Sequence, residues 1–423
     1  MARQRLDPVQ PRRVAITGMS VGCALGFEVD ALFEGLLAGR SGIRRIRNFP
    51  LEGADLPVVI AGEVEDEALA AAAARYGVKD PDRTTLLGMY AIGRALEEAG
   101  FATDGETPLP YDVIVGTGHG TLHYHHAALR TFLERGYRGL RPTTVVRIMF
   151  NRISSLASMR FKLTGANHVV SSACATAAVA FGEAFHRVRF GLSEGAVAAC
   201  ADSGLDLPTF SAWNRLGVLS RVSDPERASR PFDRDREGMV LGEGAAAFVL
   251  EPWETAVRRG ARPRAEVLGY GSSSDAGHIV QPDPEGQARA VRAALRSAGI
   301  GPEAIDFIST HGTGTLPADA AEARAMHLAL GEECALRIPV TNPKAQLGHL
   351  MGATAGVELA ALVRTLETGR IPACVNLDNP DPECRLGFVL GSARDAEVRI
   401  ALKNTFAFGG NNAAVILRRA DPE

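Results

Sequence analysis

The sequence predicts an α/β fold with well-buried sheets. Short apolar runs, of the kind that form buried strands, alternate with segments of helical apolar spacing along most of the chain. Glycine accounts for 45 of the 423 residues, and many of these glycines fall in turns between apolar runs. No short-period repeat and no low-complexity tract is evident. A regular alternation of strands and helices is the pattern of α/β proteins.

The first part of the chain contains both kinds of segment in order. Apolar runs predict strands at 13–18, 111–116, 196–202 and 244–251. Amphipathic spacing predicts helices at 30–37, 84–99 and 254–259, and the middle helix ends at a glycine. The segment from residue 143 onward is mixed in character, and we interpret it as a helical excursion.

A stretch of Pro, Arg and Gly at 259–264 marks the best candidate boundary between two halves. Beyond it, predicted strands at 265–271, 305–309, 336–341, 399–404 and 413–417 alternate with predicted helices at 286–298, 319–330 and 354–368. We therefore predict a flexible polar arm at 1–12, an N-terminal half at 13–258 and a C-terminal half at 259–423. The self-similarity of the halves is too weak to show in the sequence.

The composition is that of a globular enzyme. Hydrophobic residues make up 46%, charged residues 22%, and the net charge is −3, so we predict neither a nucleic-acid nor a membrane partner. No apolar run reaches transmembrane length, and the first residues lack the apolar core of a signal peptide. The six cysteines have no CxxC spacing and no secreted framework, which predicts a reduced, cytoplasmic protein.

Cys174 is the most informative residue, because an apolar strand there turns directly into a helix of small residues. A thiol in the first turn of a helix faces free backbone N–H groups and the positive end of the helix dipole, which favour the nucleophilic thiolate. The same segment also fits a buried structural cysteine. Partners elsewhere in the chain must decide between the two interpretations.

Two histidines follow predicted strands in the C-terminal half. His311 begins His-Gly-Thr-Gly-Thr, and His349 follows a second strand in Gly-His-Leu. The carboxyl ends of strands collect the chemistry of α/β proteins, so these side chains and Cys174 indicate one site. Thr313 and Thr315 alternate with glycine, and their hydroxyl groups can point at a ligand amide; they also fit an ordinary turn.

A Gly-Gly turn after a strand forms the last motif, Phe408-Gly409-Gly410. Such a turn can aim a backbone N–H into a pocket, and with the N–H of Cys174 it supplies two donors for an oxyanion. Aromatic rings beside the turn, Phe406 among them, suit a gate or an apolar channel. A purely structural turn between two strands is the alternative.

Metal binding is a further alternative for these residue types. Cys174, His311 and His349 lack any local pair with zinc-ligand spacing and any obvious acidic ligand. A denser histidine cluster comprises His119, His123, His125 and His126. We interpret this cluster as a loop and a helix face with His119 near the site, and we predict no metal.

Taken in order, the motifs resemble those of β-ketoacyl-acyl-carrier-protein synthases of the elongating, dimeric type. They are Ser-Ala-Cys-Ala-Thr at 172–176, Arg-Pro-Phe-Asp at 230–233, Gly-Glu-Gly-Ala at 242–245, His-Gly-Thr-Gly-Thr at 311–315, Lys344, Gly-His-Leu at 348–350, Asn-Leu-Asp-Asn-Pro at 376–380 and Phe-Gly-Gly at 408–410. The resemblance covers the chain from about Arg13 to Leu417. It implies a thiolase-like fold, with two similar α/β halves packed in alternating helix and sheet layers.

The resemblance also implies a reaction. An acyl thioester on Cys174 would condense with malonyl-acyl-carrier protein, with decarboxylation, to give a 3-oxoacyl-acyl-carrier protein. His311 and His349 would hold the malonyl carbonyl and stabilise the enolate, and Lys344 and Glu358 would support this charge network. The pathway would be fatty-acid synthesis or type II polyketide or polyene synthesis.

Further residues would bind the substrate and its carrier. The resemblance implies that Thr313 and Thr315 bind the phosphopantetheine arm, and that Phe408 is the gate of the acyl pocket and part of the oxyanion hole. It places Asp275 and His278 on a mobile loop opposite the gate, and His119 at the acyl pocket. Arg138 and Arg221 would dock the acidic carrier protein. The arm is substrate, and no cofactor is implied. The partner subunit would be an identical chain or a related ketosynthase-like chain.

Three positions depart from the family pattern. Ala407 replaces a glycine between two Phe residues and stiffens the gate, Asn411 replaces a threonine, and His119 replaces a small or aliphatic residue. These departures favour a specialised acyl chain.

Two other functions fit the same family. A chain-length-determining partner subunit would not need the intact Cys174, His311 and His349. A thiolase-like acyltransferase acting on CoA esters would use a second cysteine near the C-terminus as a base. This chain has Phe408-Gly409-Gly410 in that region instead, which argues against the thiolase alternative.

Overall fold

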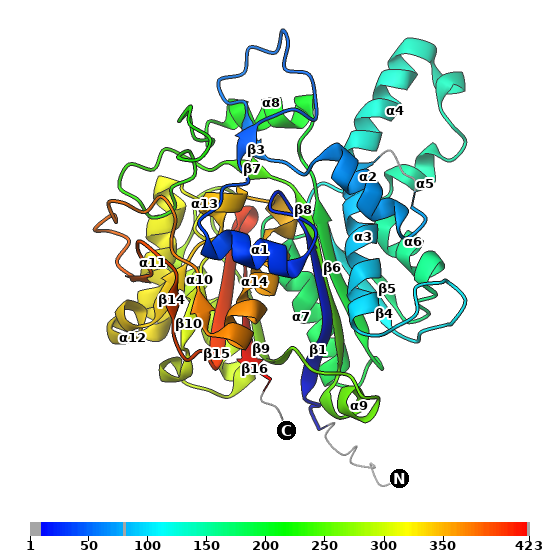
Figure 1. Cartoon of the computed structure of the whole chain (residues 1–423). Coiled ribbons are helices and arrows are strands. Elements are labelled where there is room, and N and C mark those ends of the chain that lie inside the picture. Colours follow the sequence, from blue (N-terminus) through cyan, green and yellow to red (C-terminus); the bar gives the residue numbers. More distant parts are fainter. Residues whose placement is uncertain (1–9, 79–81, 421–423) are drawn as a thin grey trace, which may run out of the picture.

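The computed structural model describes residues 10–78 and 82–420. Within these residues, eleven strands form one mixed sheet that runs through the molecule (Figure 1). From one edge to the other the strands are β13 (Gly387–Phe388), β11 (Pro339–Thr341), β10 (Phe307–Ser309), β15 (Ile400–Ala407), β16 (Asn411–Arg419), β9 (Ala265–Ser274), β1 (Val14–Gly22), β8 (Gly244–Pro252), β6 (Ala196–Asp202), β4 (Asp112–Gly116) and β5 (Asn167–Val170). Most of the predicted arm at 1–12 lies outside the described residues.

The two sides of this sheet repeat one pattern of strand pairing. The series β5, β4, β6, β8 and β1 is joined by two parallel and then two antiparallel pairings. The series β11, β10, β15, β16 and β9 is joined in the same order. The last strands of the two series, β1 and β9, pair antiparallel through residues 14–16 and 265–267. The topology therefore contains the repeat that the sequence does not show, and a boundary between 258 and 259 stays a prediction.

Helices cover the sheet and also fill the space between its two sides. Helix α3 (Arg83–Glu98) packs on β1, β8 and β6, and α10 (Pro284–Ala298) packs on β9 and β16 and against α11 (Leu316–Leu330). Between the two sides lie α7 (Thr176–Arg189) and α14 (Thr354–Thr368), which contact each other and strands of both series. Helix and sheet layers therefore alternate, as predicted.

Matching glycines allow the outer helices to approach the strands closely. A Cβ atom on Gly18 of β1 would lie 2.2 Å from the carbonyl oxygen of Ala95 in α3. One on Gly269 of β9 would lie 2.5 Å from the carbonyl oxygen of Ala294 in α10. Because any larger side chain would push the helix away, both layers depend on glycine at equivalent places.

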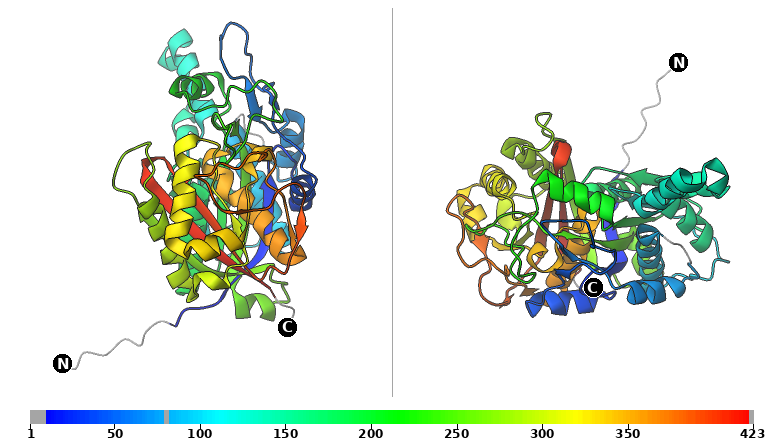
Figure 2. Two further views of the ribbon diagram at one scale, coloured as in Figure 1. Left: turned by 90° about the vertical axis from the view of Figure 1, so that its left-hand side faces the viewer. Right: turned by 90° about the horizontal axis from the view of Figure 1, so that it is seen from above.

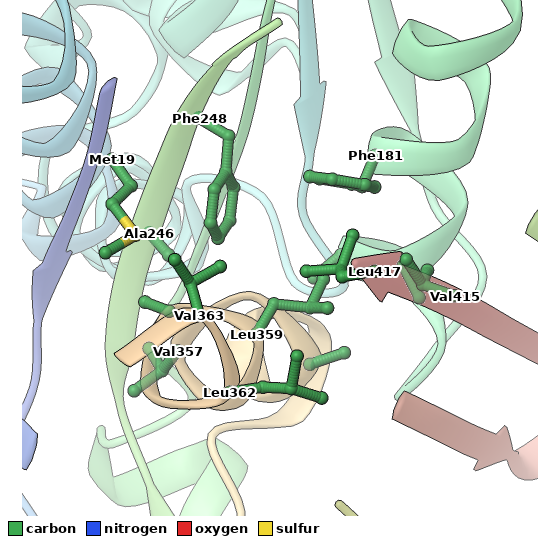
Figure 3. Packing of buried hydrophobic residues seen from close by; sticks show 14 of the residues in the cluster. Met19, Phe181, Ala246, Phe248, Val357, Leu359, Leu362, Val363, Val415 and Leu417 are labelled. Carbon is green, nitrogen blue, oxygen red and sulfur yellow. The ribbon is translucent and has the colours of Figure 1, made fainter. Parts of the chain in front are cut away.

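The largest core cluster lies around α14 (Figure 3). Leu359 and Val363 of α14 lie among Phe181 of α7, Phe248 of β8 and Leu417 of β16, all of them buried. Burial of each large apolar side chain contributes about 1.5–3 kcal/mol. The central helix layer is therefore a rigid support for the loops at the strand ends.

Helix boundaries follow the signals in the sequence. The carboxylate of Asp82 accepts the N–H of Thr85 at 2.8 Å and caps α3, which ends just before Gly100. Asp283 caps α10 in the same way, and Gly299 ends it with φ of 69°. The predicted helical excursion corresponds to α5 (Thr144–Ile148) and α6 (Arg152–Phe161).

One predicted strand is partly wrong. Its first residues, 336 and 337, belong to α12 (Glu332–Arg337), so β11 contains only three residues. Acidic residues at the start of α12 and the buried Ala335 stabilise this short helix.

Other elements complete the described chain. The remaining helices are α1 (Val29–Leu37), α2 (Asp66–Ala74), α4 (Leu122–Arg135), α8 (Leu207–Leu216), α9 (Trp253–Arg258) and α13 (Lys344–Leu347), and the remaining strands are β2 (Arg44–Arg45), β3 (Ile60–Gly62), β7 (Leu241–Gly242), β12 (Arg370–Ile371) and β14 (Arg394–Asp395). Four short 3-10 segments are η1 (Tyr137–Gly139), η2 (Pro302–Ala304), η3 (Met351–Ala353) and η4 (Phe408–Gly410). Among the described helices, each is too short or too polar to cross a bilayer.

Candidate active site

One pocket brings together residues that lie far apart in the chain. Cys174, His311 and His349 line it. His311 follows β10, and His349 follows α13, the short helix after β11. Further lining residues predicted for the site are Asp275, His278, Thr313, Thr315, Phe406, Phe408 and Gly410. The structure therefore unites the nucleophile candidate, the two histidines, the threonine pair and the gate.

Cys174 lies in a tight turn that precedes α7. The helix begins at Thr176, so the prediction that Cys174 occupies its first turn is wrong. Ala173 has φ of 47°, a strained value for a residue with a side chain. The Thr176 hydroxyl holds the turn, because it accepts the N–H of Ser172 at 2.7 Å and donates to the carbonyl of Ala173 at 2.6 Å.

Burial controls the ionisation of Cys174. The residue is 8% exposed, and burial raises the pKa of its thiol to about 11. The charge of Lys344 and the backbone N–H groups of Phe408 and of Cys174 itself act in the opposite direction but do not outweigh burial. The sequence predicted a favoured thiolate, whereas burial of Cys174 in this structure favours the neutral thiol, so that prediction is wrong. The same two N–H groups are the pair predicted to form an oxyanion hole.

The two histidine rings are buried side by side. The centroids of the two rings lie 5.4 Å apart, and the angle between the ring planes is 84°. The ring of Phe406 packs against that of His311 with 6.2 Å between the centroids. Burial lowers the pKa of both His311 and His349 well below the usual value, and the nearby Lys344 and Lys403 lower these pKa values further. Both imidazoles are therefore neutral at pH 7.

Hydrogen bonds fix the tautomer of His349. Its Nδ1 accepts the backbone N–H of Met351 at 3.2 Å and lies 2.8 Å from the hydroxyl of Thr354. The ring proton is therefore assigned to Nε2. This Nε2 is buried and has no hydrogen-bond partner among the described residues. A buried N–H without a partner in the pocket is suited to a substrate oxygen.

A Lys–Glu–Lys array lies behind His311. Glu358 of α14 contacts Lys344 at 2.8 Å and Lys403 of β15 at 2.7 Å, and all three side chains are about 1% exposed or less. Lys344 also donates to the carbonyl oxygen of His311. The predicted Lys344–Glu358 pair is thus part of a larger network.

Thr313 and Thr315 lie together on the pocket wall. Their hydroxyl oxygens are 2.9 Å apart. The buried Asp319 carboxylate accepts the N–H groups of Thr313 at 2.9 Å and Gly314 at 3.1 Å. This turn fixes both hydroxyl groups in the pocket.

Two loops close over the other side of the pocket. Phe408 stacks on Trp213 with centroids 6.3 Å apart. The N–H of Gly409 donates to the carbonyl of Ile279 at 2.7 Å, and the N–H of Asp275 donates to the carbonyl of Gly410 at 2.9 Å. The loop that carries Asp275 and the exposed His278 is therefore bonded directly to the Phe-Gly-Gly turn.

His119 lies outside the lining of this pocket. Its Nδ1 and its backbone N–H both lie 3.0 Å from the wholly buried carboxylate of Asp202, whose charge raises the pKa of His119. His123, His125 and His126 have separate partners in Leu205, Ile148 and Asp206. The residues described in the structure contain no group of three potential metal ligands.

Arg138 and Arg221, the predicted docking residues, are both exposed. Sequence reasoning missed Lys403 and Asp202. Lys403 directly follows three apolar residues of β15, and Asp202 ends the otherwise apolar strand β6. A charge at the end of an apolar run is the signal that could have identified both residues.

The thiolase-like fold and the pocket cysteine define a class of acyl-transferring enzymes. The chain belongs to the β-ketoacyl synthase family. Residues 11–256 match the N-terminal domain of that family, and residues 264–378 match its C-terminal domain.

Related proteins match over nearly the full length. The chain is 37% identical over 421 residues to a 3-oxoacyl-[acyl-carrier-protein] synthase 2 of Rhizobium meliloti, covering 96% of this chain and 99% of that protein. It resembles the solved ishigamide ketosynthase/chain length factor, with 35% identity, a TM-score of 0.88 and coverage of 97% and 100%. A β-ketoacyl synthase from Burkholderia phymatum has 32% identity, a TM-score of 0.87 and the same coverage. The predicted reaction class is confirmed: the chain is a condensing acyltransferase of fatty-acid or polyketide synthesis.

Proposed function

We propose that the chain elongates acyl groups on acyl carrier protein through a thioester on Cys174. In the first step the sulfur of Cys174 attacks the acyl thioester, and the thiol proton passes to the departing phosphopantetheine sulfur. The N–H groups of Cys174 and Phe408 stabilise the oxyanion of this step. The observation that carries the proposal is the single pocket that holds Cys174, His311 and His349.

In the second step malonyl-acyl-carrier protein loses CO₂ and forms an enolate. His349 donates from Nε2, and the neighbouring His311 completes the site for the enolate oxygen. The enolate attacks the acyl carbonyl and expels the sulfur of Cys174, which takes up one proton. The products are 3-oxoacyl-acyl-carrier protein, CO₂ and the free enzyme, and the step requires no cofactor.

The substrate arm enters between the threonine pair and the two bonded loops. Thr313 and Thr315 hold the phosphopantetheine amides, and movement of Phe408 and the Asp275 loop opens the acyl pocket. His119 lies outside the pocket lining, but its charge lowers the pKa of the pocket residue His349. On this ground His119 is the proposed determinant of a specialised acyl chain. Arg138 and Arg221 bind the acidic carrier protein. The enzyme works in a reducing cytoplasm.

Intact-mass spectrometry of the protein offered a panel of acyl-carrier-protein thioesters tests this function. We expect a mass increase equal to one acyl group, located on Cys174 by peptide mapping, and its loss as 3-oxoacyl product when malonyl-acyl-carrier protein is added. Controls are the same acyl groups on CoA, which should load more slowly. Loading from CoA alone, or loading without elongation, would contradict the proposal.

The segment around α4 supports a second proposal, a dimer of two ketosynthase-like chains. This segment projects from the body of the molecule (Figures 1 and 2), and none of the residues of α4 is buried. Large apolar side chains exposed there are Leu129, Phe132, Leu133, Tyr137, Val145, Val146, Met149 and Phe150. Monomers rarely expose so many together. Strand β5 forms the edge of the sheet on the same side of the molecule (Figure 1), and it can pair with the same strand of a partner around a twofold axis.

Leu133→Glu should convert a dimer of this chain into monomers, because Leu133 is 74% exposed and a carboxylate would be buried in the interface. Light scattering measures the mass, and Leu390→Glu, at an exposed leucine of the C-terminal half, is the matched control. If the purified chain is monomeric, co-purification from the host should recover a related chain. A monomer with no such companion would refute the dimer.

A further inference from the structure

Lys403 is a buried lysine beside the two histidines, in addition to the Lys344 of the predicted network. It follows the apolar residues 400–402 of β15 and is wholly buried. An unpaired charge in such a place is strongly unfavourable, so the contacts of Lys403 must explain its presence.

The contacts of Lys403 reach the backbone that carries His311. Its Nζ donates to the carbonyl oxygen of Thr310 at 2.7 Å and to that of Ser309 at 3.3 Å. It also contacts Glu358 at 2.7 Å. The carbonyl of Thr310 belongs to the peptide group just before His311, so Lys403 holds one side of the histidine.

Charged side chains hold both peptide groups that flank His311. Lys344 donates to the carbonyl oxygen of His311. On the opposite side, the Glu322 carboxylate accepts the N–H of His311 at 2.7 Å and the N–H of Gly312 at 2.6 Å. Because the lysines share Glu358 as a partner, a shift of either one would be transmitted to His311.

The electrostatic surroundings of these groups come from several elements. The charged and titratable groups that face His311 are Lys344, His349, Lys403 and, through the backbone, Glu322. Those that face His349 are Lys344, Lys403 and His119. Those that face Lys403 are Glu358, Lys344 and Glu322. Both lysines lower the pKa of each histidine. Burial lowers the pKa of Lys403 itself to about 8.

We propose that Lys403 is a positioning residue for the condensation, which fixes the backbone of His311 through Thr310 and supplies positive charge beside the developing enolate. The proposal rests on the function proposed above for His311 and His349. Lys403 itself touches neither substrate nor reacting atoms.

Lys403→Met tests this role, with the exposed Lys162→Met as a matched control for loss of a lysine. Rates of malonyl-acyl-carrier-protein decarboxylation are measured between pH 5 and 8, together with acyl loading of Cys174. Removal of a nearby cation raises the pKa of both histidines, so they become protonated at higher pH and the acidic limb of the decarboxylation profile moves upward. We expect a shift of about one pH unit and a rate loss of about tenfold, with acyl loading and the Lys162→Met enzyme close to wild type.

Two further variants separate charge from packing. Lys403→Arg retains the cation and should leave the acidic limb unshifted. Lys403→Gln retains a donor for the Thr310 carbonyl without the charge, should show the shift, and replaces Lys403→Met if that variant does not fold. A folded Met or Gln variant with the wild-type rate and pH profile overturns the proposal, as does an equal loss in all variants without a shift. If the wild-type enzyme itself does not decarboxylate malonyl-acyl-carrier protein, the proposed function of the histidines fails instead.

Discussion

Replacement of Cys174 with alanine is expected to abolish acyl loading and chain elongation. No other described cysteine lines the pocket, so no nearby thiol can take over the acyl group. Decarboxylation of malonyl-acyl-carrier protein should persist, because His311 and His349 remain in place. Intact-mass analysis measures loading, and release of CO₂ measures decarboxylation.

Cys334→Ala provides the matched control for Cys174→Ala. Cys334 is partly exposed on α12 and lies outside the pocket, so this variant should load and elongate normally. Elongation by folded Cys174→Ala enzyme would show that the assignment of the nucleophile is wrong.

In the wild-type enzyme, alkylation of Cys174 by iodoacetamide should accelerate with rising pH toward the pKa of about 11, because only the thiolate reacts.

Replacement of His349 with alanine should reduce malonyl decarboxylation by about 100-fold or more, the usual effect of removing one donor from an oxyanion site. Its Nε2 is the buried N–H that has no other partner among the described residues. His311→Ala should also suppress decarboxylation. Acyl loading of Cys174 should fall much less in both variants, since the N–H groups of Cys174 and Phe408 are unchanged.

His327→Ala is a suitable control for the histidine variants. His327 lies near the end of α11, where its ring bonds the carbonyl of Arg385 at 2.7 Å, and it is absent from the pocket lining. Normal decarboxylation by both His311→Ala and His349→Ala would remove the basis for their proposed role. Equal losses of loading and decarboxylation would instead indicate a general disturbance of the pocket.

Local patterns were sufficient to predict most of the strands and helices. The apolar runs that became β4, β6, β8 and β16 are buried along their length, or nearly so, and therefore carry an unambiguous signal. Helix α4 was predicted only as the helix face of the histidine cluster, without bounds, and none of its residues is buried. The family resemblance implied two similar halves, but local patterns could not show the repeated order of strand pairing, because pairing depends on contacts between distant segments.

The sequence by itself determined the α/β class, the order of the motifs and the residue types of the site. Each of these is encoded in short segments: an apolar run that ends in a glycine turn specifies both a strand and the place of the residue that follows it. The order of the motifs also predicted the family, and the matches to both of its domains confirm that prediction.

Only the tertiary structure decided the charges in the site. Burial makes Cys174 a thiol of raised pKa and makes His311 and His349 neutral, although the sequence predicted a favoured thiolate for Cys174. The contact of Lys403 with Glu358 joins β15 to α14, and no local pattern encodes it. The free energy of a charge depends on the depth of its burial and on its partners, and both are set when distant parts of the chain pack together.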